Sequence, residues 1–116
     1  MNFREATLKY FFPRLKDFQG IPGRLEPVNE GQDFSVVVDF SYKPSGLEAV
    51  LDTMKNIVEG KLIVVWGAVG NREARHRTES ARVLDFNVDE LVLTTDDPYL
   101  EDPKQIANHV KQGLNR

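Results

Sequence analysis

The stretch KLIVVWGAVGNREARHRTESARVLDFNVDELVLTT, residues 61–95, decides the fold. Its two ends, KLIVVWG (61–67) and ELVLTT (90–95), are apolar and rich in β-branched residues, which predicts two buried strands. The segment RTESARVLDF (77–86) between them has the spacing of a helix. A strand, a helix and another strand in this order predict a parallel pair of strands joined by a crossover helix.

Two further helices are predicted beside this unit. KPSGLEAVLDTMKNIV (43–58) and PKQIANHVKQGL (103–114) each carry one apolar stripe. The side chains expected to face inward are Leu47, Val50, Leu51, Met54 and Val58 in the first, Ala81, Leu84 and Phe86 in the central helix, and Ile106, Val110 and Leu114 in the last. Trp66 is expected in the core.

The ends of these helices carry recognisable signals. Ser45 and Glu48 have the spacing of a capping box, and Gly60 is expected to stop the same helix. Either Asp102 or Asp97 is expected as the N-cap of the last helix, before Pro103.

FSVVVDF (34–40) is predicted to be a further strand, which completes the alternation of strands and helices along the chain. RLEPV (24–28) is predicted to be an edge strand, because Pro27 donates no ladder hydrogen bond. We therefore predict the α/β class, with a Rossmann-like, mostly parallel sheet and flanking helices. The last helix has no strand to return to, so either residues 1–30 cover the open sheet edge or the chain is part of something longer; we expect a domain truncated at its C-terminal end.

The N-terminal part is expected to be separate. A short helix is predicted over residues 3–12, on Phe3, Leu8, Phe11 and Phe12, and Pro13 should end or kink it. QGIPG (19–23) is turn chemistry. We predict a connecting segment at 1–19 and a domain at 20–116.

Composition narrows the class of protein. The 116 residues suffice for one modest core, and 41% apolar with 28% charged residues is ordinary for a globular protein. The net charge of −3 gives no reason to expect a nucleic-acid partner. No apolar run spans a bilayer and there is no cysteine, which excludes disulfides and fits a cytoplasmic protein.

Three loops follow the carboxyl ends of the expected strands, at 39–46, 67–76 and 96–102, where open α/β sheets bind ligands. The loop GAVGNREARHR could hold an anion, but it lacks both the P-loop and the dinucleotide-binding spacing. On local pattern alone, its arginines, including Arg77, read as solvated, and His76 and His109 as surface residues. No catalytic arrangement and no metal site is predicted.

The acidic turn at Asp96 and Asp97 has two readings. It is either ordinary helix-entry chemistry or a carboxylate pair that faces an ammonium group.

Four motifs in order give a resemblance that no single motif carries. They are GRLE (23–26), VDFSYKP (38–44), VWGAVGNRE (65–73) with Arg77, and TDDPYLEDP (95–103). This set resembles the C-terminal domain of Mur ligases, the ATP-dependent amide ligases of peptidoglycan (cell-wall) precursor synthesis. Within this family the motifs look most like the branch of UDP-N-acetylmuramoyl-tripeptide synthetase, which adds a diamino acid to a UDP-muramoyl dipeptide. The resemblance covers about residues 20 to 113.

The resemblance implies two sets of site residues. Nucleotide contacts would come from Arg24, Asp39, Tyr42, Lys43 and Pro44. Arg72 would hold the α-carboxylate of the incoming amino acid, in the bidentate manner of a guanidinium. The side-chain pocket of that amino acid would be lined by Asp96, Asp97, Pro98 and Tyr99.

Departures from the family pattern suggest the substrate. Tyr42 and Lys43 replace His and Thr, Val69 replaces a glycine, Asp97 replaces Asn, and Tyr99 replaces an arginine that pairs with the second carboxylate of diaminopimelate. Without that arginine, Asp97 should favour a side chain that ends in a bare ammonium and repel a carboxylate. The resemblance therefore implies L-lysine as the added amino acid.

Two absences limit the activity expected of the chain. The sequence has no G-K-T P-loop, which Mur ligases carry in a central ATPase domain, and the family's final segment is missing. The chain alone is therefore expected to be inactive, with ATP, Mg²⁺, the UDP-MurNAc-peptide and the central domain as partners in the intact enzyme. The alternatives are a non-catalytic binding or interaction module derived from this domain, and an unrelated small α/β nucleotide-binding domain.

Overall fold

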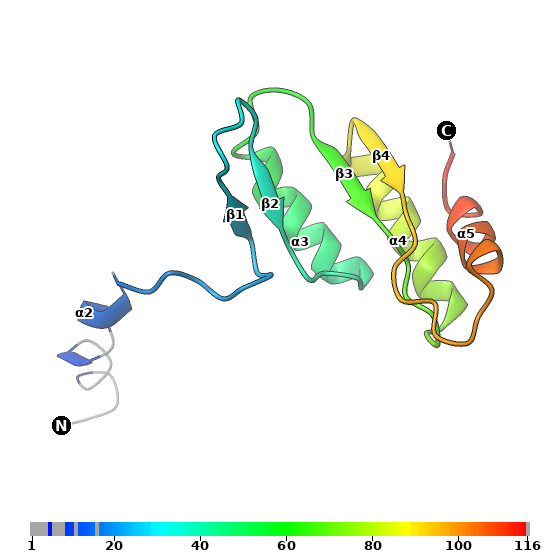
Figure 1. Ribbon diagram of the computed structural model, residues 1–116, viewed down its shortest axis with the longest axis horizontal. Coiled ribbons are helices and arrows are strands. Elements are labelled where there is room, and N and C mark those ends of the chain that lie inside the picture. The colour runs from blue at the N-terminus through cyan, green and yellow to red at the C-terminus, as the bar shows by residue number, and fades with distance from the viewer. Residues whose placement is uncertain (1–4, 6–8, 11, 16, 116) are drawn as a thin grey trace. The chain divides into compact units, whose positions relative to one another are not determined.

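The computed structural model describes Glu5, Lys9, Tyr10, residues 12–15 and residues 17–115, in two compact units at 1–40 and 41–116 (Figure 1). The helix expected over 3–12 lies mostly outside the described residues. Helix α2 spans Phe12–Leu15 and includes Pro13 in its first turn, and the predicted end or kink of the earlier helix at Pro13 rests on residues outside the described ones. Near the start of a helix the missing N–H of proline costs no hydrogen bond.

In the first unit, β1 (Glu26–Val28) and β2 (Val36–Val38) form an antiparallel pair in which Glu26 faces Val38 and Val28 faces Val36. The strand expected around Pro27 is confirmed. The strand expected over 34–40 is shorter, and in the described part of the chain it pairs with β1 and not with a parallel neighbour. Its apolar run favoured a strand, but such a run does not specify the partner.

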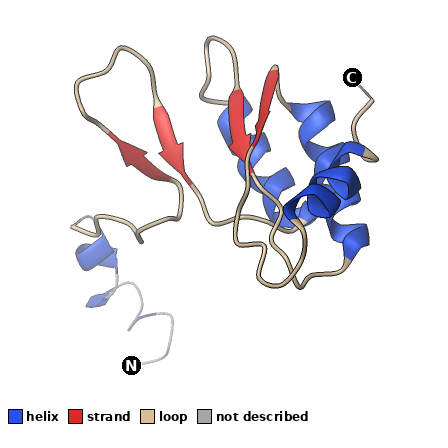
Figure 2. Ribbon diagram, turned by 45° about the vertical axis from the view of Figure 1, so that its right-hand side comes forward, coloured by secondary structure: helices blue, strands red, loops and turns tan. Residues whose placement is uncertain are grey.

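The second unit contains the predicted strand–helix–strand core. Strands β3 (Ile63–Trp66) and β4 (Glu90–Leu93) are parallel, in a register that pairs Val64 with Leu91 and Trp66 with Leu93. Helix α4 (Ala74–Asn87) connects them, and α3 (Pro44–Lys55) and α5 (Pro103–Lys111) pack on α4. Figure 2 shows the helices of this unit beside its two strands. This arrangement confirms the mixed α/β class.

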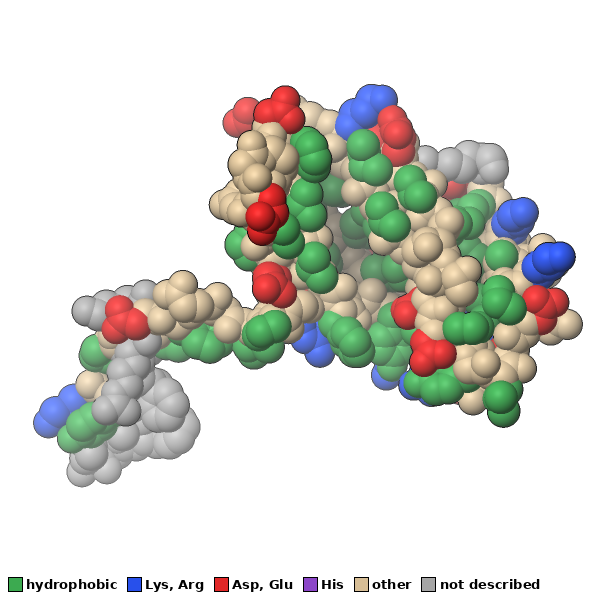
Figure 3. Space-filling view, viewed as in Figure 1, with side chains coloured by type: hydrophobic (Ala, Val, Ile, Leu, Met, Phe, Trp, Pro, Cys, Tyr) green, Lys and Arg blue, Asp and Glu red, His purple; other side chains and the backbone are tan. Residues whose placement is uncertain are grey.

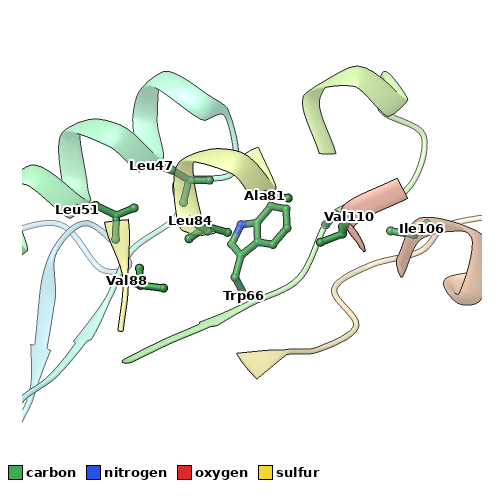
Figure 4. Close-up of a cluster of buried hydrophobic side chains, with 9 residues drawn as sticks. Leu47, Leu51, Trp66, Ala81, Leu84, Val88, Ile106 and Val110 are labelled. Carbon is green, nitrogen blue, oxygen red and sulfur yellow. The ribbon is translucent and has the colours of Figure 1, made fainter. Parts of the chain in front are cut away.

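Strand alternation places the core on one side of the β3–β4 pair. Trp66 lies among Leu84, Ala81 and Val110, so β3, α4 and α5 share one apolar cluster (Figure 4). The buried apolar residues are Leu47, Leu51, Trp66, Ala68, Ala81, Leu84, Val88, Ile106 and Val110. Phe86, expected to face inward, is 88% exposed, because two residues after Leu84 a helix has turned by about 200°.

The other side of the same strands is exposed. Ile63, Val65 and Val92 are 53%, 67% and 49% exposed, and hydrophobic side chains are visible over β3 and β4 in Figure 3. The prediction that these strands are buried is therefore wrong for this face in the described residues. Alternation along each strand sends every second side chain to the opposite face.

The helix ends differ from prediction in α3 and agree with it in α5. Helix α3 begins at Pro44, so Ser45 lies inside the first turn, and no side chain caps its start. It ends at Lys55, before the expected stop at Gly60. In α5 the Asp102 carboxylate accepts a hydrogen bond from Lys104 N at 2.9 Å, which makes Asp102 the N-cap. No helix among the described residues has the length and apolar character to cross a membrane.

Replacing Leu84 with alanine should lower the free energy of unfolding by about 2–5 kcal/mol, because it leaves a cavity in a fully buried site. Phe86→Ala on the same helix is the matched control and should change it by about 0.5 kcal/mol or less. Urea denaturation followed by circular dichroism measures both. Similar losses in the two variants would contradict this description of the core.

Candidate substrate site

The loops that follow β3 and β4 are in backbone contact. Gly70 N donates to the carbonyl of Asp97 at 2.8 Å. A Cβ atom on Gly70 would lie 2.0 Å from Pro98 O, and one on Gly67 would lie 2.7 Å from Asp96 N. No side chain fits at either position unless the loops separate, so these two glycines let the second and third predicted loops meet.

Val69, which replaces a glycine of the family pattern, lies between these contacts. Among the described residues the non-glycine positions with positive φ are Leu25, Asn71 and Tyr99, and Val69 is not one of them. A valine therefore fits position 69 without a left-handed backbone.

Arg77 is buried, with 3% of its side chain exposed, and its guanidinium forms a bidentate pair with Glu101. Nη2 donates to Oε1 at 2.7 Å and Nη1 donates to Oε2 at 2.8 Å. Nη1 also lies 3.1 Å from Nδ1 of His109 on α5. The prediction that Arg77 is solvated is wrong, and His109, expected at the surface, is half-buried beside it. Both Arg77 and Glu101 stood in the quoted motifs, but sequence reasoning gave them no role.

The same pair reaches the loop that carries Arg72. Arg77 Nη2 donates to Arg72 O at 3.2 Å, and Glu101 Oε1 accepts from Asn71 N. Asn71 has φ of 52°, a left-handed conformation that asparagine tolerates better than most residues. These contacts hold the backbone on both sides of the Asn71–Arg72 peptide.

The Arg77 guanidinium and the Asn71 amide lower the pKa of Glu101 from 4.5 to about 2, because both stabilise its ionised form.

The predicted amino-acid pocket residues lie on the surface of these loops. Arg72 is exposed and donates to the carbonyl of Asn71 at 3.2 Å, and within the described part of the chain it forms no salt bridge. Asp97 Oδ1 accepts from Tyr99 N at 3.0 Å, and Asp96 Oδ1 accepts from Asp97 N at 2.7 Å. Asp97 thus stabilises its own turn and does not cap α5, and Tyr99 is 52% exposed with φ of 50°.

The predicted nucleotide residues are divided between the two units. In the first, Arg24 stacks on Phe40 with 5.3 Å to the ring centroid, and Asp39 Oδ2 accepts from Leu25 N at 3.0 Å. In the second, Ser80 on α4 donates to Tyr42 O at 3.1 Å, and Lys43 precedes Pro44 at the start of α3.

Within the described residues no group of three acidic or histidine side chains could hold a metal ion.

A parallel strand–helix–strand unit with a guanidinium and carboxylates on its strand-end loops defines a small α/β domain, and open α/β sheets bind ligands at this end of their strands. The chain belongs to the Mur ligase family: residues 23–116 match the model described as "Mur ligase, glutamate ligase domain". It is therefore a Mur ligase C-terminal domain, as the motifs predicted.

Relatives of known name support this assignment. The chain is 42% identical over 100 residues to the UDP-N-acetylmuramoyl-L-alanyl-D-glutamate–2,6-diaminopimelate ligase of Bacillus velezensis, over 86% of this chain and 20% of that protein. It is 41% identical over 96 residues to the ligase of the same name from Corynebacterium efficiens, over 83% and 18%. A solved structure of a ligase with this name has a TM-score of 0.74 and 31% identity, over 89% of this chain and 21% of that one. The chain thus spans about a fifth of the length of these relatives.

Gly70→Ala should lower the free energy of unfolding by about 1–3 kcal/mol, because the added methyl group overlaps Pro98. It should also shift the amide NMR signals of Asp97 and Tyr99. Gly60→Ala is the control, since a Cβ there meets nothing within 4 Å. Equal effects of the two substitutions on stability would show that the loops do not meet as described.

Glu101 should make stability depend on pH below 4.5. Its pKa is lowered to about 2 in the folded chain, so the unfolded chain binds more protons between these values and folding gains from rising pH. The stability difference between wild type and Glu101→Gln should be constant above pH 5.5 and should shrink as pH falls towards 2. Urea titrations across this range measure it, and Glu59→Gln, in an exposed loop, is the control for charge loss. A difference that does not change with pH would contradict the ion pair.

Proposed function

We propose that this chain is the part of an ATP-dependent ligase that binds the incoming diamino acid, which the intact enzyme adds to UDP-MurNAc-dipeptide. One observation carries the proposal: the Gly70–Asp97 hydrogen bond joins the turn that carries Arg72 to the turn that carries Asp97 and Tyr99. A guanidinium and a carboxylate on adjoining turns suit a zwitterion, which bears a carboxylate at one end and an ammonium at the other.

In this proposal Arg72 binds the α-carboxylate of the amino acid. A guanidinium has five N–H donors, and the single bond that Arg72 makes to Asn71 O leaves donors for a ligand. Asp97 can take the side-chain ammonium, because Oδ2 is not the atom that accepts from Tyr99. Fixing both ends orients the α-amine, and orientation of a nucleophile is itself a large source of rate acceleration.

ATP supplies the chemistry that activates the carboxyl group to be joined. Arg24 and Lys43 are cations that form no salt bridge in the described part of the chain, so they fit as partners of nucleotide phosphates. We propose that Mg²⁺ acts with ATP in the intact enzyme. Because the sequence has no P-loop, we propose that the chain alone does not catalyse ligation. The use of ATP favours the cytoplasm as the site of action.

We propose L-lysine as the added amino acid. Tyr99 offers no charge to a second carboxylate, and Asp97 would repel one. Diaminopimelate is the second candidate, because both named relatives carry it in their names.

Titration of the chain with L-lysine and with meso-diaminopimelate, followed by NMR shifts of ¹⁵N-labelled protein, tests this proposal. We expect tighter binding of lysine, with shifts at Arg72 and Asp97. Asp97→Asn should weaken lysine binding about 10-fold, as expected for loss of a charge-assisted hydrogen bond. The double variant Asp97→Asn, Tyr99→Arg should prefer diaminopimelate. Asp52→Asn, which removes an exposed carboxylate from α3, is the matched control.

If the wild type binds diaminopimelate more tightly, the proposal of lysine as the substrate is wrong, but the proposed site is not contradicted. No shift at Arg72 or Asp97 with either amino acid would contradict the site itself.

A further inference from the structure

Burying the Arg77 guanidinium beside Glu101 costs desolvation free energy, and the contacts of the pair indicate a function for it. Among the described residues Arg77 is the one charged side chain that is fully buried, and its Nε has no hydrogen-bond partner. Desolvation of the buried guanidinium offsets part of its attraction to Glu101, whose side chain is 29% exposed. The specific geometry of the pair therefore suggests a role besides stabilisation of the fold.

The contacts of the pair lie on both sides of the Asn71–Arg72 peptide. Glu101 Oε1 accepts from Asn71 N, and Arg77 Nη2 donates to Arg72 O at 3.2 Å. Arg77 comes from α4, while Glu101 follows the turn at Asp97 and Tyr99, where its own N–H donates to Pro98 O at 3.0 Å. One ion pair thus links the backbone of Arg72 to the turn that carries the acidic residues.

We propose that Arg77 and Glu101 are positioning residues for Arg72 and thereby set the affinity for the α-carboxylate of the amino acid. This inference rests on the proposed function. Neither residue contacts the substrate; they fix the left-handed backbone at Asn71, which has φ of 52°, and so direct the guanidinium of the next residue. His109, whose Nδ1 lies 3.1 Å from Arg77 Nη1, steadies the pair from α5.

The test compares two ligands that differ only in the α-carboxylate. L-Lysine has it, and pentane-1,5-diamine does not. Arg77→Lys keeps the charge but loses the bidentate fork. It should weaken lysine binding about 10-fold, the effect of one misplaced charge-assisted hydrogen bond, and leave diamine binding unchanged. In an Arg72→Ala background it should cause no further loss, because the two substitutions act on the same contact.

Equal weakening for both ligands, or an additive loss in the Arg72→Ala background, would overturn the proposal. If Arg77→Lys does not fold, Glu101→Asp serves instead, because it keeps the charge and the Glu101 side chain is 29% exposed. It should give the same dependence on ligand.

If the wild type binds neither lysine nor diaminopimelate, the proposed function fails but the positioning role can still be judged. The NMR signals and backbone order of Asn71 and Arg72 should then change in Arg77→Lys while those of α3 stay as in the wild type. Unchanged signals at Asn71 and Arg72 would overturn the positioning role.

Discussion

The bidentate pair between Arg77 and Glu101 is the contact on which the arrangement of the loops depends. It joins α4 to the segment before α5, and through Asn71 and the carbonyl of Arg72 it also holds the loop that follows β3. The apolar cluster around Trp66 and Leu84 fixes where the strands and helices lie, but apolar contacts are not directional. Hydrogen bonds to a planar guanidinium are directional, and they set the orientation of the surface turns.

The glycines act with this pair and not in place of it. Gly67 and Gly70 allow the two loops to approach, since any side chain there would meet the backbone of Asp96 or Pro98. The ion pair between Arg77 and Glu101 then holds the two loops in this close approach. The result is a rim on which Arg72 and Asp97 come from adjoining turns, although 25 positions separate them in the sequence.

Much of the fold was predictable because it follows from local rules. Apolar, β-branched runs gave β3 and β4 their type, helical spacing gave α4 its buried Ala81 and Leu84, and Asp102 before Pro103 gave the start of α5. The errors have different causes. Phe86 follows Leu84 by two positions, which places it on the outer side of its helix. The pairing of β2 with β1 is long-range, because it depends on a neighbour that the sequence of β2 does not specify. For the site, motifs located the loops, but the burial of Arg77 depends on Glu101, which is distant in sequence, so spacing alone could not reveal it.

The left-handed backbone at Tyr99 bears on how such a domain evolves. The conformation disfavours β-branched residues most strongly and treats the other large side chains much alike. Exchange of one long side chain for another at this position therefore has little effect on the backbone energy. Under the proposed function, a single substitution at Tyr99 can change the preferred amino acid while the fold stays the same.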